Sequence, residues 1–214
     1  MTDEKTTPDG LILGAGQLAR CWWCGTSPLY VDYHDEEWGR PVRDDRRLFE
    51  KLCLEAFQSG LSWNTILVKR ENFRAAFDNF EMAEMARYDE GEIERLLGDA
   101  GIVRHRGKIE AVLHNAKAAL ELIAAEGSLA KFVWAFEPPT SERPQRLDRA
   151  SLGNLAKTPS SIALAKALKG RGWKFVGPTT AYAFMQSMGL VNDHLAGCHA
   201  RDEIEAERER FVRP

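Results

Sequence analysis

Hydrophobic residues recur at intervals of three and four along most of the chain, which is the period of an amphipathic helix. The pattern is clearest from residue 44 onward, where it runs through Leu48, Phe49, Leu52, Cys53, Ala56 and Phe57, breaks at Gly60, and resumes at Phe73, Phe77 and Phe80. Further helices are expected near residues 91–98, 106–126, 128–136, 160–169 and 179–188. Alternating apolar and polar residues over strand-length windows are almost absent. The pattern therefore predicts an all-α fold.

The two ends of the chain differ from this helical middle. Residues 1–19 contain Pro8 and several glycines without a sustained period, and we expect them to form a flexible N-terminal extension. Residues 20–200 are expected to form one domain of two packed helical parts, joined through a proline-rich loop at residues 137–151. Residues 201–214 are a charged C-terminal tail, which predicts a solvated terminal helix or a frayed end.

Composition excludes several classes of protein. With 214 residues, of which 44% are hydrophobic and 29% charged, the chain is long and apolar enough to bury a core without disulfides. No apolar run approaches the roughly 18 to 20 residues of a membrane span, and residues 1–10 do not resemble an export signal. We therefore expect a cytoplasmic protein with no membrane partner and no obligate protein partner. The net charge of −3 excludes a broadly basic surface but allows a local basic face.

A glycine motif near the N-terminus imitates a dinucleotide-binding fingerprint. Residues 11–19 run from apolar residues into Gly14-Ala15-Gly16 and then Ala19, in the pattern Gly-x-Gly-x-x-Ala. That fingerprint requires a helix and then a second strand within about 30 residues. Here a Cys-Trp-Trp-Cys-Gly segment and Pro28 follow instead. A dinucleotide-dependent enzyme is therefore the least favoured of our hypotheses.

Two segments at opposite ends of the chain offer metal ligands. The candidates are Cys21, His34, His194 and Cys198. His194 and Cys198 are four residues apart, so on a helical turn both ligand atoms face the same way. Two cysteines and two histidines have the stoichiometry of a closed, structural zinc site. Cys24 is an alternative ligand because it is three residues after Cys21, and burial alone also explains many cysteines. Cys53 lies on an apolar helix face and is assigned to the core.

Aromatic residues are dense in the first 63 positions, which hold four of the six tryptophans and two of the four tyrosines: Trp22, Trp23, Tyr30, Tyr33, Trp38 and Trp63. Flat aromatic faces can stack on a nucleobase and favour a cationic one. For Trp22 and Trp23, packing over the metal is the favoured alternative. Glu55 falls near the apolar face of its helix, where a carboxylate needs either a partner or a chemical task. A structural acid bound by a backbone N–H group or an arginine is the alternative.

Basic residues and glycines meet at two expected helix boundaries. One segment is Arg104-His105-Arg106-Gly107-Lys108, and the other runs from Lys169 through Lys174 to Gly177 and Pro178. The second has the form of a hairpin that enters a helix, where free N–H groups and nearby cations bind a phosphate. A solvated charged turn is the alternative for each segment. Two such segments in an acidic chain favour nucleic-acid binding, with Arg106, Lys108, Lys174 and Gly177 as the contacts.

Several separated motifs together resemble the DNA-3-methyladenine glycosylase I family of bacterial alkylation-repair enzymes. They cover roughly residues 20 to 198 and are specific. They comprise Cys21 to Trp38, Leu54-Glu55, Gly60-Leu61-Ser62-Trp63, Lys69-Arg70-Glu71-Asn72, Asp99-Ala100-Gly101-Ile102, Arg104 to Lys108, Phe175-Val176-Gly177, Phe184-Met185-Gln186 and Gly189 to His194.

The resemblance implies an all-α helix-hairpin-helix fold with a structural zinc ion. The family's zinc ligands correspond to Cys21, His34, His194 and Cys198, and Cys21 fits the family register from Pro28 and His34 without a gap, which favours it over Cys24. The family's base pocket corresponds to Glu55, Tyr33 and Trp63, with Trp38 beside them. By the same resemblance, the turn at Gly60 and Leu61 enters the DNA where the base leaves.

The activity implied is hydrolytic excision of 3-methyladenine from double-stranded DNA without strand cleavage. Glu55 would accept hydrogen bonds from the adenine amino edge while Tyr33 and Trp63 sandwich the cationic base. Other helix-hairpin-helix glycosylases carry a catalytic Asp where this chain has Asn192, so an Asp-driven mechanism is not expected. Water is the expected nucleophile, because no lysine stands at a matching position of the motif. A zinc-stabilised module that binds DNA damage without releasing a base is the alternative hypothesis.

Overall fold

The computed structural model of the chain describes residues 7 and 9–214, which form mainly helices. The α-helices within the described residues are α1 (Pro28–Glu36), α2 (Asp45–Gln58), α3 (Trp63–Leu67), α4 (Arg70–Ala76), α5 (Met82–Met85), α6 (Glu90–Gly98), α7 (Arg106–Glu126), α8 (Leu129–Trp134), α9 (Arg149–Leu152), α10 (Pro159–Gly170), α11 (Pro178–Ser187) and α12 (Arg201–Arg210). The same described part of the chain contains four short 3-10 helices, at Ala15–Gln17, Trp22–Cys24, Asp78–Phe80 and Thr140–Glu142. The sequence predicted an all-α fold, and the structure is mostly helical but also contains one two-stranded sheet.

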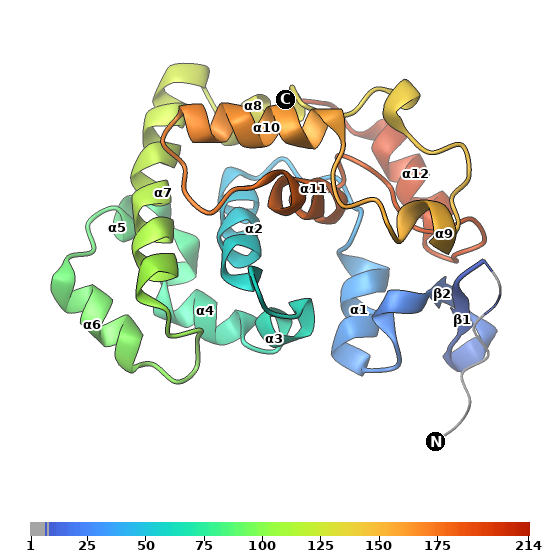
Figure 1. Cartoon of the computed structure of the whole chain (residues 1–214), viewed down its shortest axis with the longest axis horizontal. Helices are drawn as coiled ribbons and strands as arrows, with labels where there is room; N and C mark the ends of the chain where they lie inside the picture. The colour runs from blue at the N-terminus through green and yellow to red at the C-terminus, as the bar shows by residue number, and fades with distance from the viewer. Residues whose placement is uncertain (1–6, 8) are drawn as a thin grey trace.

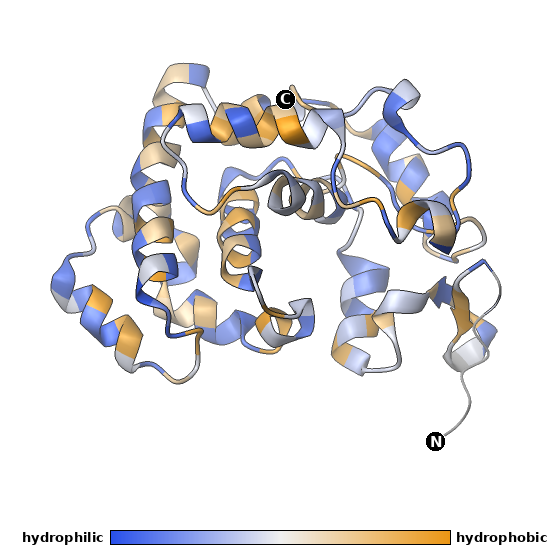
Figure 2. Cartoon of the chain, in the orientation of Figure 1, coloured by the Kyte–Doolittle hydropathy of each residue, from blue (hydrophilic) through white to orange (hydrophobic). Residues whose placement is uncertain are grey.

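Helix α2 is the centre of the molecule. It contacts α3, α7, α8 and α11, and Figure 1 shows α7 on one side of it with α10 and α11 above. Its N-cap Asp44 accepts a hydrogen bond from the backbone of Arg47, and the chain leaves the helix through Gly60, whose φ is +81°. Hydrophobic bands alternate with hydrophilic ones along the helices (Figure 2), as expected for amphipathic packing. Helix α2 is therefore held in a core to which several other helices contribute.

The N-terminal region differs from the expected flexible extension. Residues Leu11–Leu13 and Ala19–Cys21 form an antiparallel hairpin, β1 and β2, in which Leu11 pairs with Cys21. The side chain of Ile12 is only 3% exposed, and the backbone N–H of Arg149 donates to the carbonyl of Asp9 over 3.0 Å. Strands of three residues are too short to show an alternating pattern, which explains why the sequence did not predict them. Of the predicted extension, residues 1–6 and 8 lie outside the described residues.

The glycine motif in this hairpin does not form a nucleotide-binding loop. Gly14 precedes a three-residue 3-10 helix, and Gly16 adopts a φ of +71° in the turn that connects β1 to β2. A dinucleotide fingerprint needs an α-helix at this point, since the helix N-terminus binds the pyrophosphate. Within residues 9–27 no α-helix begins. The dinucleotide-dependent hypothesis is therefore wrong.

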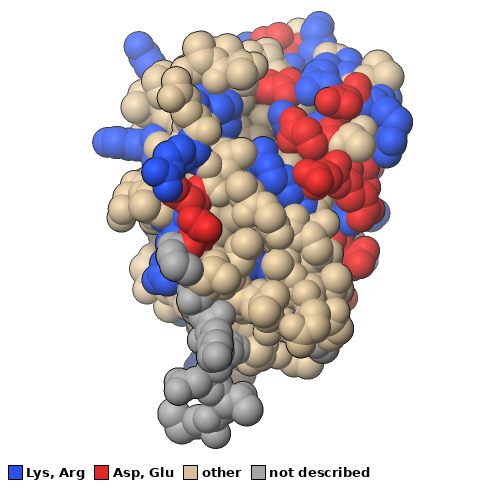
Figure 3. Space-filling model, turned by 90° about the vertical axis from the view of Figure 1, so that its right-hand side faces the viewer, with Lys and Arg blue, Asp and Glu red and all other residues tan. Residues whose placement is uncertain are grey.

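The charged tail forms α12, which packs against the domain. Its residue Ile204 is fully buried, and Arg40 pairs with Glu203 over 3.1 Å. Figure 1 shows α12, α9 and the β1–β2 hairpin on one side of the molecule, and Figure 3 shows that acidic and basic groups are mixed over the upper part of this side, above a largely uncharged area. Among the described residues, no helix is both long enough and apolar enough to cross a membrane.

Candidate active site

A cavity of about 290 Å³ lies between α1, α2, α3, α9 and α11. All four residues predicted to bind a base line it: Tyr33, Trp38, Glu55 and Trp63. Most of the other lining residues were not predicted from the sequence to belong to this pocket; they are Trp22, Trp23, Tyr30, Gln58, Leu152, Gly153, Leu155, Ala183, Gln186 and Asp193. A concave site that combines several aromatic walls with polar side chains such as Glu55, Gln186 and Asp193 is typical of a ligand pocket.

Helix α1 supplies the first aromatic wall. Pro28 occupies its first turn, and Tyr30 and Tyr33 follow almost one turn apart, so both project to the same side with their ring centroids 6.5 Å apart. Trp23 packs edge-on against Trp38, with a centroid separation of 4.7 Å. The spacing of three between the two tyrosines was the sequence signal that could have added Tyr30 to the predicted pocket.

The rings of Tyr33 and Trp63 are in direct contact. Their centroids are 5.4 Å apart and their planes are tilted by 43°. A base held between two rings needs about 7 Å, because each stacked contact takes about 3.5 Å. The expected sandwich between these two rings therefore does not exist in this structure. Both rings instead belong to one wall of the cavity, and a flat ligand would contact them from the same side.

Glu55 is a buried carboxylate whose partner is also buried. Its side chain is 5% exposed, and Oε1 lies 3.1 Å from the Nζ atom of Lys51, one helical turn earlier on α2. Burial raises the pKa of Glu55, while the charge of Lys51 and its hydrogen bond act to lower it. A backbone N–H group or an arginine was the expected structural partner of Glu55, and Lys51 takes that place instead.

The turn after α2 is exposed and conformationally constrained. Gly60 has a left-handed backbone, and Leu61 is 41% exposed, although it is a large apolar residue. A second cavity of about 300 Å³ joins this turn to Thr179 and Thr180 at the start of α11. The turn and the beginning of α11 therefore face the same space next to the aromatic pocket.

Lys108 supports this turn from inside the protein. Its Nζ atom donates to the carbonyls of Phe57 and Ser59 over 2.9 and 2.6 Å, and its side chain is buried. Burial also lowers the pKa of Lys108. Lys108 was expected to contact a DNA phosphate. Its ammonium group instead donates hydrogen bonds to the carbonyls at the end of α2 and is not free to bind DNA. Its visible role is to fix the conformation that presents Leu61.

The hairpin before α11 is clamped by helix α7. The side chain of Asn115 accepts from the backbone N–H of Lys174 over 2.8 Å and donates to its carbonyl over 3.0 Å. The N-cap of α11 is Gly177, and α10 and α11 pack closely on either side of residues 171–177. The free N–H groups at the start of α11 and the side chain of Lys174 are thus held on a rigid loop. The buried Asn115 was not found from the sequence, because its role appears only when the two segments meet.

Arg106, another expected DNA contact, is exposed but paired. Its guanidinium group lies 2.7 Å from Glu90 and 3.5 Å from Glu110, and it also pairs with Glu94. The expected phosphate contact would have to displace these carboxylates. An exposed pair of this kind contributes little stability, so the exchange costs little.

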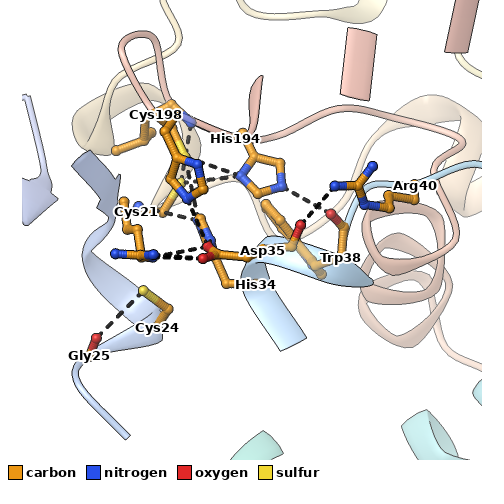
Figure 4. A network of polar contacts seen from close by, with 12 residues as sticks. Cys21, Cys24, Gly25, His34, Asp35, Trp38, Arg40, His194 and Cys198 are labelled. Atoms are coloured by element: carbon orange, nitrogen blue, oxygen red, sulfur yellow. Dashed lines mark hydrogen bonds and ion pairs between the residues drawn. The ribbon is translucent and has the colours of Figure 1, made fainter. Parts of the chain in front are cut away.

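The four predicted metal ligands converge, although they come from opposite ends of the chain. Their ligand atoms all lie within 4.8 Å of one another, and all four side chains are buried. Figure 4 shows Cys21, His34, His194 and Cys198 around one point, with Cys24 turned away toward Gly25. His194 and Cys198 lie in a loop with Gly197 at a φ of +83°, and the expected helical turn is absent there. A left-handed glycine provides the reversal that brings the two ligands together.

The distances among these ligand atoms fit a zinc ion. Bonds of about 2.3 Å to sulfur and about 2.0 Å to nitrogen, at tetrahedral angles, separate a sulfur from a nitrogen ligand by about 3.5 Å. The Sγ atom of Cys198 lies 3.5 Å from His34 and 3.4 Å from His194, and the Sγ atom of Cys21 lies 3.9 Å from His194. Hydrogen bonding from Cys21, together with both histidines, lowers the pKa of the Cys198 thiol, which favours the thiolate that binds metals.

Each histidine of the Cys2His2 cluster is oriented through the ring nitrogen that faces away from the other three candidate ligands. The Nε2 atom of His194 lies 2.9 Å from the carbonyl oxygen of Trp38, and the Nδ1 atom of His34 lies 2.7 Å from Asp35. Although burial raises the pKa of Asp35, hydrogen bonds from Arg20, His34 and His199 hold it below its ordinary value. Carboxylate and carbonyl partners of this kind fix ring orientation in metal sites. Trp23 packs on His34, so one set of side chains supports both the candidate metal ligands and the pocket.

Asn192 and Asp193 face different sides of the chain. Asn192 donates to Glu205 over 2.9 Å and does not line the aromatic pocket, whereas Asp193 does. The carboxylate of Asp193 accepts from the Tyr182 hydroxyl over 2.6 Å and from Gln186 over 2.8 Å, and it pairs with Arg143. The pocket therefore holds a carboxylate at Asp193, one residue after Asn192, but both of its oxygens are already bound by other side chains.

A mostly helical fold with an aromatic pocket, a buried carboxylate and an exposed glycine turn beside them has the form of a binding site for a flat ligand. Residues 23–201 match the model of the methyladenine glycosylase family, and the chain belongs to that family. The matched region begins just after β2, so the β1–β2 hairpin lies outside it.

Similar proteins agree with this assignment. The chain is 49% identical over 182 residues to DNA-3-methyladenine glycosylase 1 of Escherichia coli (strain K12), with 85% of this chain and 96% of that protein covered. A crystal structure of 3-methyladenine DNA glycosylase I is 52% identical, with a TM-score of 0.78 over 85% of this chain and 99% of the other. A variant of 3-methyladenine DNA glycosylase I in complex with 3-methyladenine is 34% identical, with a TM-score of 0.78 and coverages of 85% and 97%.

Proposed function

We propose that this chain is a DNA repair glycosylase that flips 3-methyladenine out of alkylated double-stranded DNA and excises it by hydrolysis. The observation that carries the proposal is the buried carboxylate of Glu55 in a cavity walled by Tyr33, Trp38 and Trp63. The solved relative bound to 3-methyladenine supports the choice of ligand.

Recognition of the base rests on charge and on hydrogen bonding. Methylation at N3 gives the adenine a positive charge, and an aromatic wall favours a cation by about 0.5 to 2 kcal/mol. Glu55 accepts hydrogen bonds from the adenine amino edge, and a charged hydrogen bond contributes about 1.5 to 3 kcal/mol. Guanine presents a carbonyl oxygen at the same edge, which the carboxylate repels. Poor release of 7-methylguanine follows.

Extrusion of the nucleotide is assigned to the turn after α2 and to the hairpin before α11. The exposed Leu61 enters the duplex where the base leaves, which offsets part of the few kcal/mol that flipping costs. Gly177 and Lys174 bind the phosphate backbone near the start of α11, and Arg106 contributes once it leaves its acidic partners. These contacts carry no sequence information, as a repair enzyme that acts at any position requires.

Cleavage of the glycosidic bond needs little acid assistance, because the methylated base leaves as a neutral molecule. Glu55 is the catalytic residue in this scheme, since it touches the departing base and holds it through hydrogen bonds to the adenine amino edge. Water is the nucleophile. Lys51 lines a different, smaller cavity behind Tyr33 and Trp63. A monofunctional enzyme without strand cleavage is therefore proposed.

The Cys2His2 cluster is proposed to hold one structural zinc ion through Cys21, His34, His194 and Cys198. When bound, the ion ties α1 to the segment before α12 and carries no step of the reaction, because four protein ligands leave no open position. His34 directly follows Tyr33 in the chain, and Trp38 lies four residues beyond His34, so this cross-link also holds the pocket wall. A cytoplasmic location, where bacterial DNA lies, and the absence of an obligate protein partner stay predictions.

The test is chromatography of the bases released from methylated duplex DNA. We expect 3-methyladenine in the released fraction with the wild type and with Glu209→Gln, an exposed acid on α12 that serves as the matched control. Glu55→Ala is expected to release far less. No released base from a folded sample that binds DNA would reject the proposal in favour of the damage-binding module.

A further inference from the structure

Lys51 is a buried cation that the glycosylase scheme does not use. It lies on α2, is 5% exposed, and has its Nζ atom 3.1 Å from Glu55 Oε1. The same atom donates to the hydroxyl of Tyr33 over 2.8 Å and lies 3.3 Å from the ring centroid of Trp63. One ammonium group thus contacts three residues of the base pocket.

The ammonium group reaches these residues from behind the pocket. Lys51 lines a cavity of about 40 Å³ whose walls also include Tyr33 and Trp63. Those two aromatic residues also line the 290 Å³ cavity, so they separate the two spaces. A ligand in the larger cavity would meet the front of the aromatic wall, while Lys51 supports its rear.

We propose that Lys51 is the positioning residue of the base pocket, whose ammonium group keeps Glu55 ionised and oriented and braces Tyr33 and Trp63 from the rear. The inference rests on the proposed function, because it assigns Glu55 to the recognition of the base. It adds that the charge of Lys51, a side chain that does not touch the ligand, determines the pH range over which the pocket binds the base and the affinity of that binding.

The charges around Lys51 make Glu55 its main partner. Glu37, at the end of α1, is held by Arg70 of α4 through contacts of 2.6 and 2.7 Å, so these two groups largely neutralise each other. Tyr33 from α1 is neutral, since burial and nearby carboxylates raise its pKa well above the usual value. The small cavity also contains a Glu50–Arg74 pair at 2.8 Å, and Arg47.

Removing the charge of Lys51 is expected to change the protonation of Glu55. Burial raises the pKa of Glu55, and the opposite charge of Lys51 is what counteracts this. A buried glutamate without such a partner can remain protonated to neutral pH and above. A protonated Glu55 presents one O–H donor toward the base and has a weaker acceptor, so it binds the adenine amino edge less well.

The experiment measures binding of free 3-methyladenine by tryptophan fluorescence as a function of pH. The wild type and Lys51→Arg, which keeps the charge, are compared with the uncharged Lys51→Met and Lys51→Gln. The acid limb of the binding profile is expected to move up by at least about one pH unit in both uncharged variants, which is about a tenfold loss of affinity within the shifted range. Titration of the ligand itself is common to all variants and cancels in the comparison.

Two controls separate the possible outcomes. Glu55→Gln is expected to bind weakly with no acid limb, which shows that the limb belongs to Glu55. Thermal unfolding identifies any variant that does not fold, and the second uncharged variant then carries the test. If the uncharged variants lose affinity equally at every pH and the acid limb does not move, Lys51 has a merely structural role and the inference is overturned. A pH profile identical to that of the wild type also overturns it. Failure of the wild type to bind or release 3-methyladenine overturns the proposed function itself.

Discussion

The Nδ1 atom of His34 lies 2.7 Å from Asp35, while the opposite nitrogen of the same ring lies 3.5 Å from the sulfur of Cys198. Asp35 also accepts from Arg20 of β2 and from His199. The hairpin, α1 and the segment before α12 therefore meet at one carboxylate. Since Tyr33 precedes His34 directly, whatever fixes this ring also fixes the pocket wall.

Loss of a metal ligand is expected to remove bound zinc and destabilise the fold. Elemental analysis should find one zinc per chain in the wild type and less than one after Cys198→Ser, with a lower Tm, because removing a ligand breaks a closed site that joins distant segments. Cys24→Ser is the matched control, since Cys24 is buried nearby but lies outside the four-ligand cluster. Full zinc in Cys198→Ser, or its loss in Cys24→Ser, would contradict the assignment.

Glu55→Gln is expected to slow release of 3-methyladenine by roughly 10- to 100-fold, which corresponds to the 1.5 to 3 kcal/mol of a charged hydrogen bond. The substitution keeps the size of the side chain and removes its charge. Single-turnover rates on methylated duplex DNA provide the measurement, with Trp63→Ala tested in parallel. If the first variant is fully active and the second is inactive, the aromatic wall alone accounts for recognition and the carboxylate role is wrong.

Helices with a repeated apolar face were predictable whatever their length, and elements without one were not. The pattern was visible in the 21 residues of α7 and also in the nine residues of α6, whereas α1, also of nine residues, and α3 lack a sustained period and depend on contacts made by tertiary packing. The same limit applies to the β1–β2 hairpin, which is stabilised by neighbours such as Arg149 and His199.

Within the site, the sequence predicted residue types better than their partners. The four candidate metal ligands converge and the four predicted base-binding residues line one cavity, because motif and ligand chemistry are local properties of the sequence. The environments of Lys51 and Lys108 were not predicted, because lysine side chains are normally exposed and both of these are buried. Only the folded structure shows that Lys51 neutralises Glu55 and that Lys108 binds the carbonyls at the end of α2.

Leu61→Ala is expected to lower the rate of excision from duplex DNA by about tenfold or more, since a smaller side chain offsets less of the cost of base flipping. The free energy of unfolding should stay within about 0.5 kcal/mol of the wild type, because Leu61 is exposed. Val68→Ala, also exposed and close to the end of α3, is the control. A duplex rate as high as that of the control would exclude Leu61 from the flipping step.

Deletion of residues 1–19 is expected to leave base release intact while lowering stability. The deletion removes β1 and the buried side chain of Ile12, whose burial contributes about 1.5 to 3 kcal/mol. It leaves every pocket residue in place and lies outside the region shared with the family. Urea denaturation and base release are measured on the same sample. A folded truncation that no longer releases the base would give the hairpin a direct part in the reaction.

The stability of the wild type relative to Lys51→Met is expected to rise with pH between about pH 8 and 10. Burial lowers the pKa of Lys51 to about 8, so over this range the unfolded chain binds more protons at this residue than the folded one. Unfolding then becomes less favourable as pH rises, by at most about 1.4 kcal/mol per pH unit.

A higher pKa of Glu55 in Lys51→Met acts in the same direction, since the folded variant loses stability as its carboxyl group ionises. Urea denaturation of both proteins at several pH values gives the difference, in which the contributions of the buried cysteines cancel. Lys117→Met, at an exposed position of α7, serves as the control and should follow the wild type at a constant offset. A constant difference between the wild type and Lys51→Met over the whole range would show that the buried lysine stays charged, and that its ion pair with Glu55 persists well above pH 8.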